Sequence, residues 1–156
     1  MPAPERPVLA FVGYGTDRGG LPARARELGI ERDVRPLGGI SPARLEDLYA
    51  TAALLITPTR YEGFGLPVLE AMARGVPVAC SDIPVLREVA GDEAAVWLDP
   101  ADPATIASAM RTLIADGPDV ERRRVAGRER AARFTWDATA QATAEVYEAA
   151  AAAVRA

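Results

Sequence analysis

Short apolar segments alternate along the chain with longer segments whose apolar residues recur every three or four positions. Five of the apolar segments predict β-strands, at residues 8–12, 33–37, 54–57, 76–80 and 94–98. The segment at residues 54–57 is typical of a strand that is buried on both faces of a parallel sheet. Strands that alternate with helices predict an α/β fold, in which a Rossmann-like open parallel sheet carries helices on both faces.

Capping residues, prolines and glycines indicate where the predicted helices begin and end. Three helices are bounded in this way, by Ser41-Pro42 at the start of the first, Pro67 and Gly75 at the ends of the second, and Asp82 and Gly91 at the ends of the third. Helical patterns also occupy residues 21–28, 103–114, 120–133 and 137–156. We expect residues 1–156 to form a single domain, with residues 137–156 as its C-terminal helix.

Length and charge restrict the class of protein. The 156 residues suit one compact domain; 49% of them are apolar and 26% are charged. A net charge of -4 argues against nucleic-acid binding, which usually needs a concentrated basic face. The sequence contains neither a membrane-spanning apolar run nor a signal-peptide core at its start. We therefore expect a soluble, cytoplasmic protein that does not bind nucleic acid, and these features do not indicate association with a membrane.

The residue types that are missing exclude several kinds of catalytic site. The chain has no histidine, and all 18 of its basic residues are arginine. It can therefore contain no Ser-His-Asp triad, no histidine-ligated zinc and no Walker A lysine. Cys80 is the only cysteine, which excludes a disulfide framework, and we expect it to pack in the core. Carboxylates, arginines and backbone amides remain for any chemistry.

The loop that follows the strand at residues 54–57 has the features of an anion site. In open α/β sheets, ligands bind at the carboxyl ends of the strands. Gly63 and Gly65 allow the backbone to approach a ligand closely, and Pro67 begins a helix whose free amides and dipole favour a phosphate. Glu62 and Glu70 lie on either side, Glu70 in the expected first helical turn. Carboxylates accept hydrogen bonds from sugar hydroxyls, so the segment suits a nucleotide-sugar; the same pattern also fits a loop and helix start without a ligand.

The segment from Glu62 to Glu70, with Gly-Phe-Gly-Leu-Pro inside it, resembles the signature of the family-4 retaining glycosyltransferases of GT-B fold. Further landmarks follow in the order of that family, among them Glu88-Val89-Ala90-Gly91-Asp92, Asp99-Pro100 and Phe134-Thr135-Trp136. The resemblance covers roughly residues 7–150. It implies a metal-independent enzyme, without other cofactors, that transfers a sugar from a nucleotide-diphosphate donor with retention of anomeric configuration.

The resemblance also implies a role for individual residues. Glu62 would contact the transferred sugar at the reaction centre, and Glu70 would hold the ribose hydroxyls. The backbone amides of Phe64, Gly65 and Leu66 would bind the distal phosphate. Leu37 and Ile40 fall where members of the family contact the base. No metal ligands are expected.

The chain departs from the family because it resembles only the C-terminal, donor-binding half of the GT-B fold. Residues 8–12 match the second strand of that half, so we expect the first strand–helix unit and its arginine-lysine pair to be missing. The missing strand is central in the order 3-2-1-4-5-6, and its loss leaves edges unpaired. We expect the chain to pair with another chain, or with the absent acceptor-binding domain, or to rearrange its strand order. We expect no turnover by this chain alone.

Two other functions remain open at this point. One is a non-catalytic module that binds a sugar nucleotide or assembles a complex. The other is an NAD-dependent Rossmann oxidoreductase, because Gly13, Gly15 and Gly19 follow a strand, although the acidic residue expected after the next strand is missing. The run Arg122-Arg123-Arg124 suits a solvated helix face or a contact with an anionic membrane.

Overall fold

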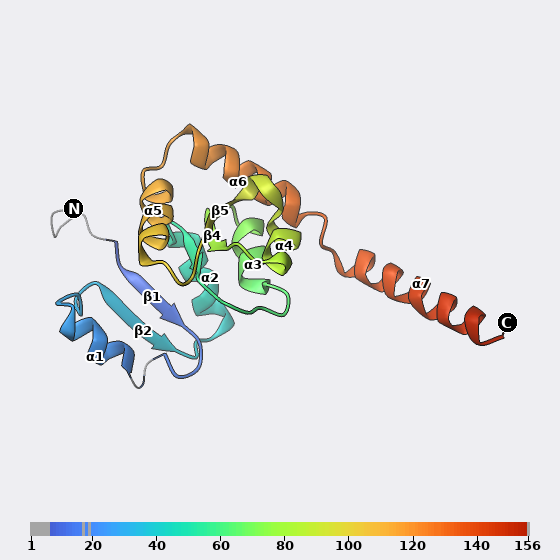
Figure 1. The fold of residues 1–156 in the computed structure, drawn as a ribbon, viewed down its shortest axis with the longest axis horizontal. Helices are drawn as coiled ribbons and strands as arrows, with labels where there is room; N and C mark the ends of the chain where they lie inside the picture. Colours follow the sequence, from blue (N-terminus) through green and yellow to red (C-terminus); the bar gives the residue numbers. More distant parts are fainter. Residues whose placement is uncertain (1–6, 17, 19, 156) are drawn as a thin grey trace. The chain divides into compact units, whose positions relative to one another are not determined.

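The computed structural model describes residues 7–16, 18 and 20–155. Its strands are β1 (Leu9–Val12), β2 (Val34–Gly38), β3 (Leu55–Thr57), β4 (Val78–Ser81) and β5 (Ala95–Leu98). Its helices are α1 (Gly20–Glu27), α2 (Pro42–Thr51), α3 (Leu66–Ala73), α4 (Pro84–Ala94), α5 (Pro103–Ile114), α6 (Pro118–Ala131) and α7 (Trp136–Arg155), all drawn in Figure 1. The predicted strands and helices are confirmed, with ends that differ by a few residues.

All strand pairs are parallel, which confirms the predicted α/β class. β1 pairs with β2 in one sheet, and β3, β4 and β5 form another in that order. These are the pairings that the order 3-2-1-4-5-6 leaves when its first strand is removed. The expected rearrangement of strand order is therefore wrong, and pairing with another chain stays a prediction. The chain forms two compact units, Met1–Leu48 and Tyr49–Ala156, which are described separately.

In the second unit, helices cover both faces of the three-stranded sheet. Side chains alternate between the faces along β4, so Ala79 faces one side while Val78 and Cys80 face the other. Ala79 belongs to a cluster with Leu113 of α5 and its neighbours. α3 and α4 contact the sheet as well, and α6 packs against both of these helices. These elements supply the core side chains that are exposed by 2% or less, namely Val68, Ala71, Met72, Val78, Ala79, Cys80, Leu86, Val89, Ala90, Ala95, Leu98, Ala109, Leu113 and Val120.

The start of α4 differs from the prediction. Asp82 was expected to cap the helix, but the N-cap is Ile83, and it makes no side-chain capping bond. The prediction is wrong because both Asp82 carboxylate oxygens bind the guanidinium of Arg87. The helix also continues to Ala94 beyond a non-helical break at Gly91, whose φ is 67°. Glycine tolerates that left-handed conformation, so Gly91 kinks α4 where the sequence predicts its end.

In the first unit, the loop after β1 is closed by Thr16. Its hydroxyl donates to the carbonyl of Gly13 at 2.9 Å and of Phe11 at 3.1 Å, and it accepts from the amide of Gly38 at 3.0 Å. Gly13 and Gly15 have positive φ values of 137° and 85°, as a tight turn requires. Gly19, the third glycine of the suggested dinucleotide pattern, lies outside the described residues.

The final helix, α7, is drawn in red in Figure 1. Every side chain described in it, from Trp136 to residue 153, is exposed. Trp136 itself is 89% exposed and is therefore not part of the core. Among the described residues, no helix combines the length and the apolar character that crossing a bilayer requires.

Candidate functional site

The candidate site begins where β3 ends. Thr57 is the last residue of β3 and pairs with Cys80 of β4. The completely buried hydroxyl of Ser81 donates to the carbonyl of Thr57 at 3.4 Å, which fixes the carboxyl end of β3 against β4. Residues 58–65 then form a loop that enters α3. The predicted strand–loop–helix unit is thus present, at the edge of the sheet where parallel α/β folds bind ligands.

Gly65 holds this loop in one position. It is the N-cap of α3, with the left-handed φ of 97° and ψ of 37°, and its carbonyl accepts from the amides of Val68 and Leu69. A Cβ at Gly65 would lie 2.6 Å from Cδ2 of Leu86, a side chain of α4 that is completely buried. Both the conformation and the close packing require glycine at this position.

The amides around Gly65 are available to a ligand. Among the residues that the structure describes, none accepts a hydrogen bond from the backbone N–H groups of Phe64, Gly65 or Leu66. They lie at the N-terminus of α3, where the helix dipole adds partial positive charge. Together they form a small cradle of donors suited to an anion, although their binding of a phosphate stays a prediction.

Glu62 lies just before this cradle. Its side chain is half-buried, and one carboxylate oxygen accepts from the amide of Gly63 at 3.0 Å. The preceding turn is closed by Thr59, whose hydroxyl donates to the carbonyl of Tyr61 at 2.6 Å. A carboxylate that is held locally and still reaches solvent can accept hydrogen bonds from hydroxyl groups of a ligand.

Glu70 is held from a distant part of the sequence. The hydroxyl of Tyr49, on α2, donates to a carboxylate oxygen of Glu70 at 3.0 Å. Tyr49 is only 7% exposed, and Glu70 is half-buried. The expected first-turn position is wrong, because α3 begins at Leu66, which makes Glu70 its fifth residue. The helix begins one residue before the predicted start at Pro67, since Gly65 is its N-cap and Pro67 stands at its second position.

Tyr49 was not predicted as a site residue from the sequence. A usable signal was available, because the hydroxyl of a buried tyrosine usually finds a hydrogen-bond partner. The guanidinium of Arg74 lies 4.9 Å from the centre of the Tyr49 ring and donates to the carbonyl of Glu70 at 2.8 Å. Tyr49, Glu70 and Arg74 thus form one connected group along α3.

Leu37 and Ile40, the residues expected near a base, belong to the first unit. Leu37 lies in β2, Ile40 follows that strand, and both are half-buried. Glu62, the glycine loop and Glu70 therefore all lie in the second unit, whereas Leu37 and Ile40 lie in the first. Their contact with a base stays a prediction.

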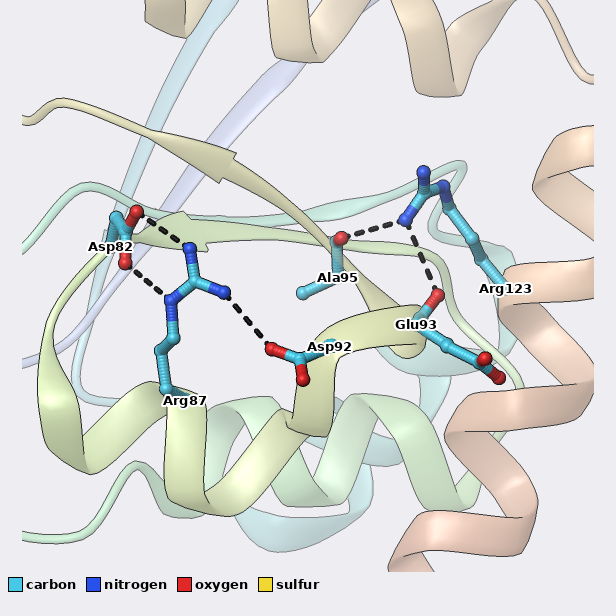
Figure 2. Close-up of polar contacts among 6 residues, drawn as sticks. All are labelled: Asp82, Arg87, Asp92, Glu93, Ala95 and Arg123. Carbon is cyan, nitrogen blue, oxygen red and sulfur yellow. Dashed lines mark hydrogen bonds and ion pairs between the residues drawn. The ribbon is translucent and has the colours of Figure 1, made fainter.

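A second charged group lies at the start and along the length of α4, directly after β4 (Figure 2). Arg87 binds the two oxygens of Asp82 at 2.6 and 2.7 Å and an oxygen of Asp92 at 3.0 Å. Its guanidinium also lies 4.3 Å from the centre of the Trp97 ring. The hydrogen bonds from Arg87 lower the pKa of the Asp82 carboxyl. These bonds join the first turn of α4 to the segment beyond its kink.

The arginine run of α6 is engaged within the protein. Arg122 and Arg123 both pair with Asp119, and Arg124 donates to Asp116 at 2.7 Å. Arg123 also donates to the carbonyl of Ala95 at 2.7 Å, at the start of β5 (Figure 2). These bonds favour a structural role for the run over a membrane contact.

Neither Cys80 nor a cluster of metal-ligating side chains provides a further reactive site in the part of the chain that the structure describes. Burial raises the pKa of the Cys80 thiol to about 12, so the thiol is packed and protonated, as the sequence predicts. Among the residues described, no three Cys, Asp or Glu side chains gather closely enough to hold a metal ion.

Comparison with known sequences gives the family. Residues 4–130 match the family model of the glycosyl transferases group 1. The O-antigen chain mannosyltransferase B of Escherichia coli is 38% identical over 74% of this chain and 30% of its own length. The glycogen synthase of Mycobacterium tuberculosis is 37% identical over 91% of this chain and 35% of its own length.

Solved structures agree with this result. The sucrose-phosphate synthase of Thermosynechococcus elongatus superposes with a TM-score of 0.80 and 28% identity, over 93% of this chain and 39% of that one. Anabaena HepE in complex with UDP superposes with a TM-score of 0.81 and 23% identity, over 94% of this chain and 42% of that one. The second unit's layout and the strand pairings are thus those of glycosyltransferases of GT-B type. The chain spans about a third of the length of the curated relatives it matches, and it belongs to the glycosyl transferases group 1 family.

Proposed function

We propose that this chain binds the donor of an anomer-retaining glycosyl transfer, a nucleotide-diphosphate sugar. The observation that carries the proposal is the cradle of amides at Phe64, Gly65 and Leu66, which donate to no acceptor in the described part of the chain. Unpaired N–H groups at a helix N-terminus favour a negative ligand, and the distal phosphate of the donor supplies that charge.

The two glutamates supply the acceptors for hydroxyl groups. The Tyr49 hydroxyl donates one hydrogen bond to Glu70 and orients its carboxylate, which keeps lone pairs free for the two ribose hydroxyls. Glu62 accepts from the adjacent Gly63 amide and, in this proposal, also from hydroxyls of the transferred sugar. Leu37 and Ile40 contact the base.

In the transfer, the bond between the anomeric carbon and the diphosphate oxygen breaks. The acceptor oxygen then bonds to the same face of that carbon, and its proton passes to the departing diphosphate oxygen. Negative charge grows on the departing diphosphate, and the amides of residues 64–66 stabilise that charge in the transition state. Glu62 positions the sugar, so catalysis rests on placement and charge stabilisation without a metal ion.

The remaining parts of the reaction come from outside these 156 residues. The chain spans 30% of the mannosyltransferase and 35% of the glycogen synthase that it resembles. We propose that an acceptor-binding domain, in the same longer protein or in another chain, completes the site. An assay for release of nucleoside diphosphate is expected to show no sugar transfer by this chain alone.

Calorimetric titration with UDP, GDP, ADP and NAD tests the donor site. At least one nucleoside diphosphate is expected to bind with one-to-one stoichiometry; the Anabaena HepE structure is a complex with UDP. Glu70→Gln is expected to weaken that binding about tenfold, since it removes a charged acceptor. Glu148→Gln is the matched control, because Glu148 is exposed on α7.

Two results would overturn the proposal. One is the absence of binding for all three diphosphates. The other is binding by Glu70→Gln with the affinity of the unaltered chain. Binding of NAD alone would instead favour an oxidoreductase.

A further inference from the structure

The loop of the candidate site contacts a residue from the far end of the second unit. Phe64 lies between the two loop glycines, and its ring meets that of Phe134 edge to face, with centroids 6.0 Å apart and planes 85° apart. Phe64 is 43% exposed, whereas Phe134 is half-buried. Edge-to-face pairs attract because the positive edge of one ring meets the negative face of the other.

Phe134 is itself held firmly. Its amide donates to the carbonyl of Ala131 at 3.0 Å, which continues the turn that ends α6. The guanidinium of Arg130 lies 5.1 Å from the centre of its ring. Arg130 in turn donates to the carbonyls of Glu88 and Val89 in α4. The position of the Phe134 ring is therefore tied to both α6 and α4.

Helix α6, which precedes Phe134, packs closely on α3. A Cβ at Gly127 of α6 would lie 3.2 Å from Cγ of Met72, so the two helices approach at short range. On another side of the loop, Gly65 lies against Leu86 of α4. The segment that presents the amide donors is thus contacted both by Leu86 and by Phe134.

We infer that Phe134 is a positioning residue for donor binding, which acts through Phe64 by holding the amides of residues 64–66 in place. The ligand in this inference, a nucleoside diphosphate, is the one that the proposed function assigns. The structural consequence does not depend on that function, because loss of the Phe134 ring frees the loop whether or not a nucleotide is present.

The first experiment measures binding of UDP, GDP and ADP to Phe134→Leu by calorimetry. Affinity for the diphosphate that binds the unaltered chain is expected to fall about three- to tenfold, the factor that one aromatic pair contributes. Phe134→Tyr keeps the ring and is expected to bind normally. Trp136→Leu, which removes an exposed aromatic side chain two residues away, is the matched control.

A double-mutant cycle separates positioning from general destabilisation. If Phe134 acts through Phe64, then Phe134→Leu has no further effect on affinity in a Phe64→Leu background. Equal additional losses in both backgrounds would overturn the inference. Should Phe134→Leu fail to fold, Phe64→Leu decides alone, because its ring is partly exposed, and unchanged affinity in that variant overturns the inference.

Hydrogen exchange without nucleotide distinguishes the two proposals. The amides of Val68 and Leu69, which donate to the Gly65 carbonyl, are expected to exchange faster in Phe134→Leu than in the unaltered chain or in Trp136→Leu. Unchanged exchange would overturn the positioning role. If exchange rises but no diphosphate binds the unaltered chain, the proposed function fails while the mechanical role of Phe134 stands.

Discussion

The crossover from β1 to α1 and the crossover from β3 to α3 both contain glycine with positive φ, Gly13 and Gly15 in the first and Gly65 in the second, but different contacts hold them. In the first, the Gly13 amide donates to the carbonyl of Gly38, the Thr16 amide donates to that of Gly13, and the Thr16 hydroxyl binds three backbone groups. In the second, the amides at residues 64–66 have no acceptor among the described residues, and side chains from α4 and the end of α6 contact the loop.

The difference shows why two glycine patterns with similar spacing carry different meaning. Glycines after β1 serve a turn that the Thr16 hydroxyl closes against Phe11 and Gly38, which accounts for them without a dinucleotide. After β3, Gly65 serves a close approach to Leu86, and the amides of residues 64–66 have no acceptor among the described residues. The way a loop is held decides whether its backbone can bind a ligand.

The largest expected effect is that of Gly65→Ala. Both a left-handed conformation and a clash with Leu86 oppose a Cβ there, and together they are expected to destabilise the second unit by about 3 kcal/mol. At Gly15 the φ is also positive but the space is open, so Gly15→Ala should cost about 1 kcal/mol.

Chemical denaturation of the variants measures both values. Gly63→Ala is the control, since its Cβ meets nothing within 4 Å. Equal losses for Gly65→Ala and Gly15→Ala would remove the distinction between the two crossovers.

Thr16→Val tests the internal closure of the first crossover. The substitution leaves the amide of Gly38, a buried residue, without its hydroxyl acceptor, and it is expected to cost about 1–2 kcal/mol. Hydrogen exchange should locate the loss in residues 9–38. Thr16→Ser keeps the hydroxyl and should retain most of the stability; a loss as large as that of valine would mean that the hydroxyl does not close the loop.

Tyr49→Phe tests the external support of the second crossover. Removal of the hydroxyl frees the Glu70 carboxylate and is expected to cost about 1 kcal/mol of stability. It should also weaken nucleoside diphosphate binding about threefold, as measured by calorimetry. Tyr147→Phe, on the exposed helix α7, should change neither quantity. Unchanged affinity in Tyr49→Phe would show that Glu70 needs no orienting partner.

The smallest effect concerns the crossover from β4 to α4, which an ion pair holds. Arg87 lowers the pKa of Asp82, so the pair stabilises the fold above the ordinary carboxyl pKa of about 3.9, and this contribution disappears as pH falls through the lowered value. Asp82→Asn should therefore reduce the midpoint of thermal unfolding slightly at pH 7, and the difference should narrow as pH falls below the ordinary carboxyl pKa. Asp137→Asn, exposed on α7, is the control. A difference that does not narrow as pH falls would contradict the assignment.

Local patterns predicted most of the fold and the central part of the site. Strand and helix positions depend on periodicity and caps, so they could be read along the chain, and the segment from Glu62 to Glu70 is a single continuous motif. Asp82 was misassigned as a cap because its real partner, Arg87, competes for the same oxygens. Tyr49 and Phe134 were missed as supports because contacts between distant residues leave no periodic signal.

The tight seat of Gly65 against Leu86 has a thermodynamic consequence for any ligand of this loop. Ordering a flexible backbone segment costs conformational entropy, which a ligand normally has to offset with its own binding energy. Here folding has already met that cost, because the core of the second unit fixes the loop before a ligand arrives. We therefore predict that an anion binding at this loop needs few contacts, because it does not have to order the backbone itself.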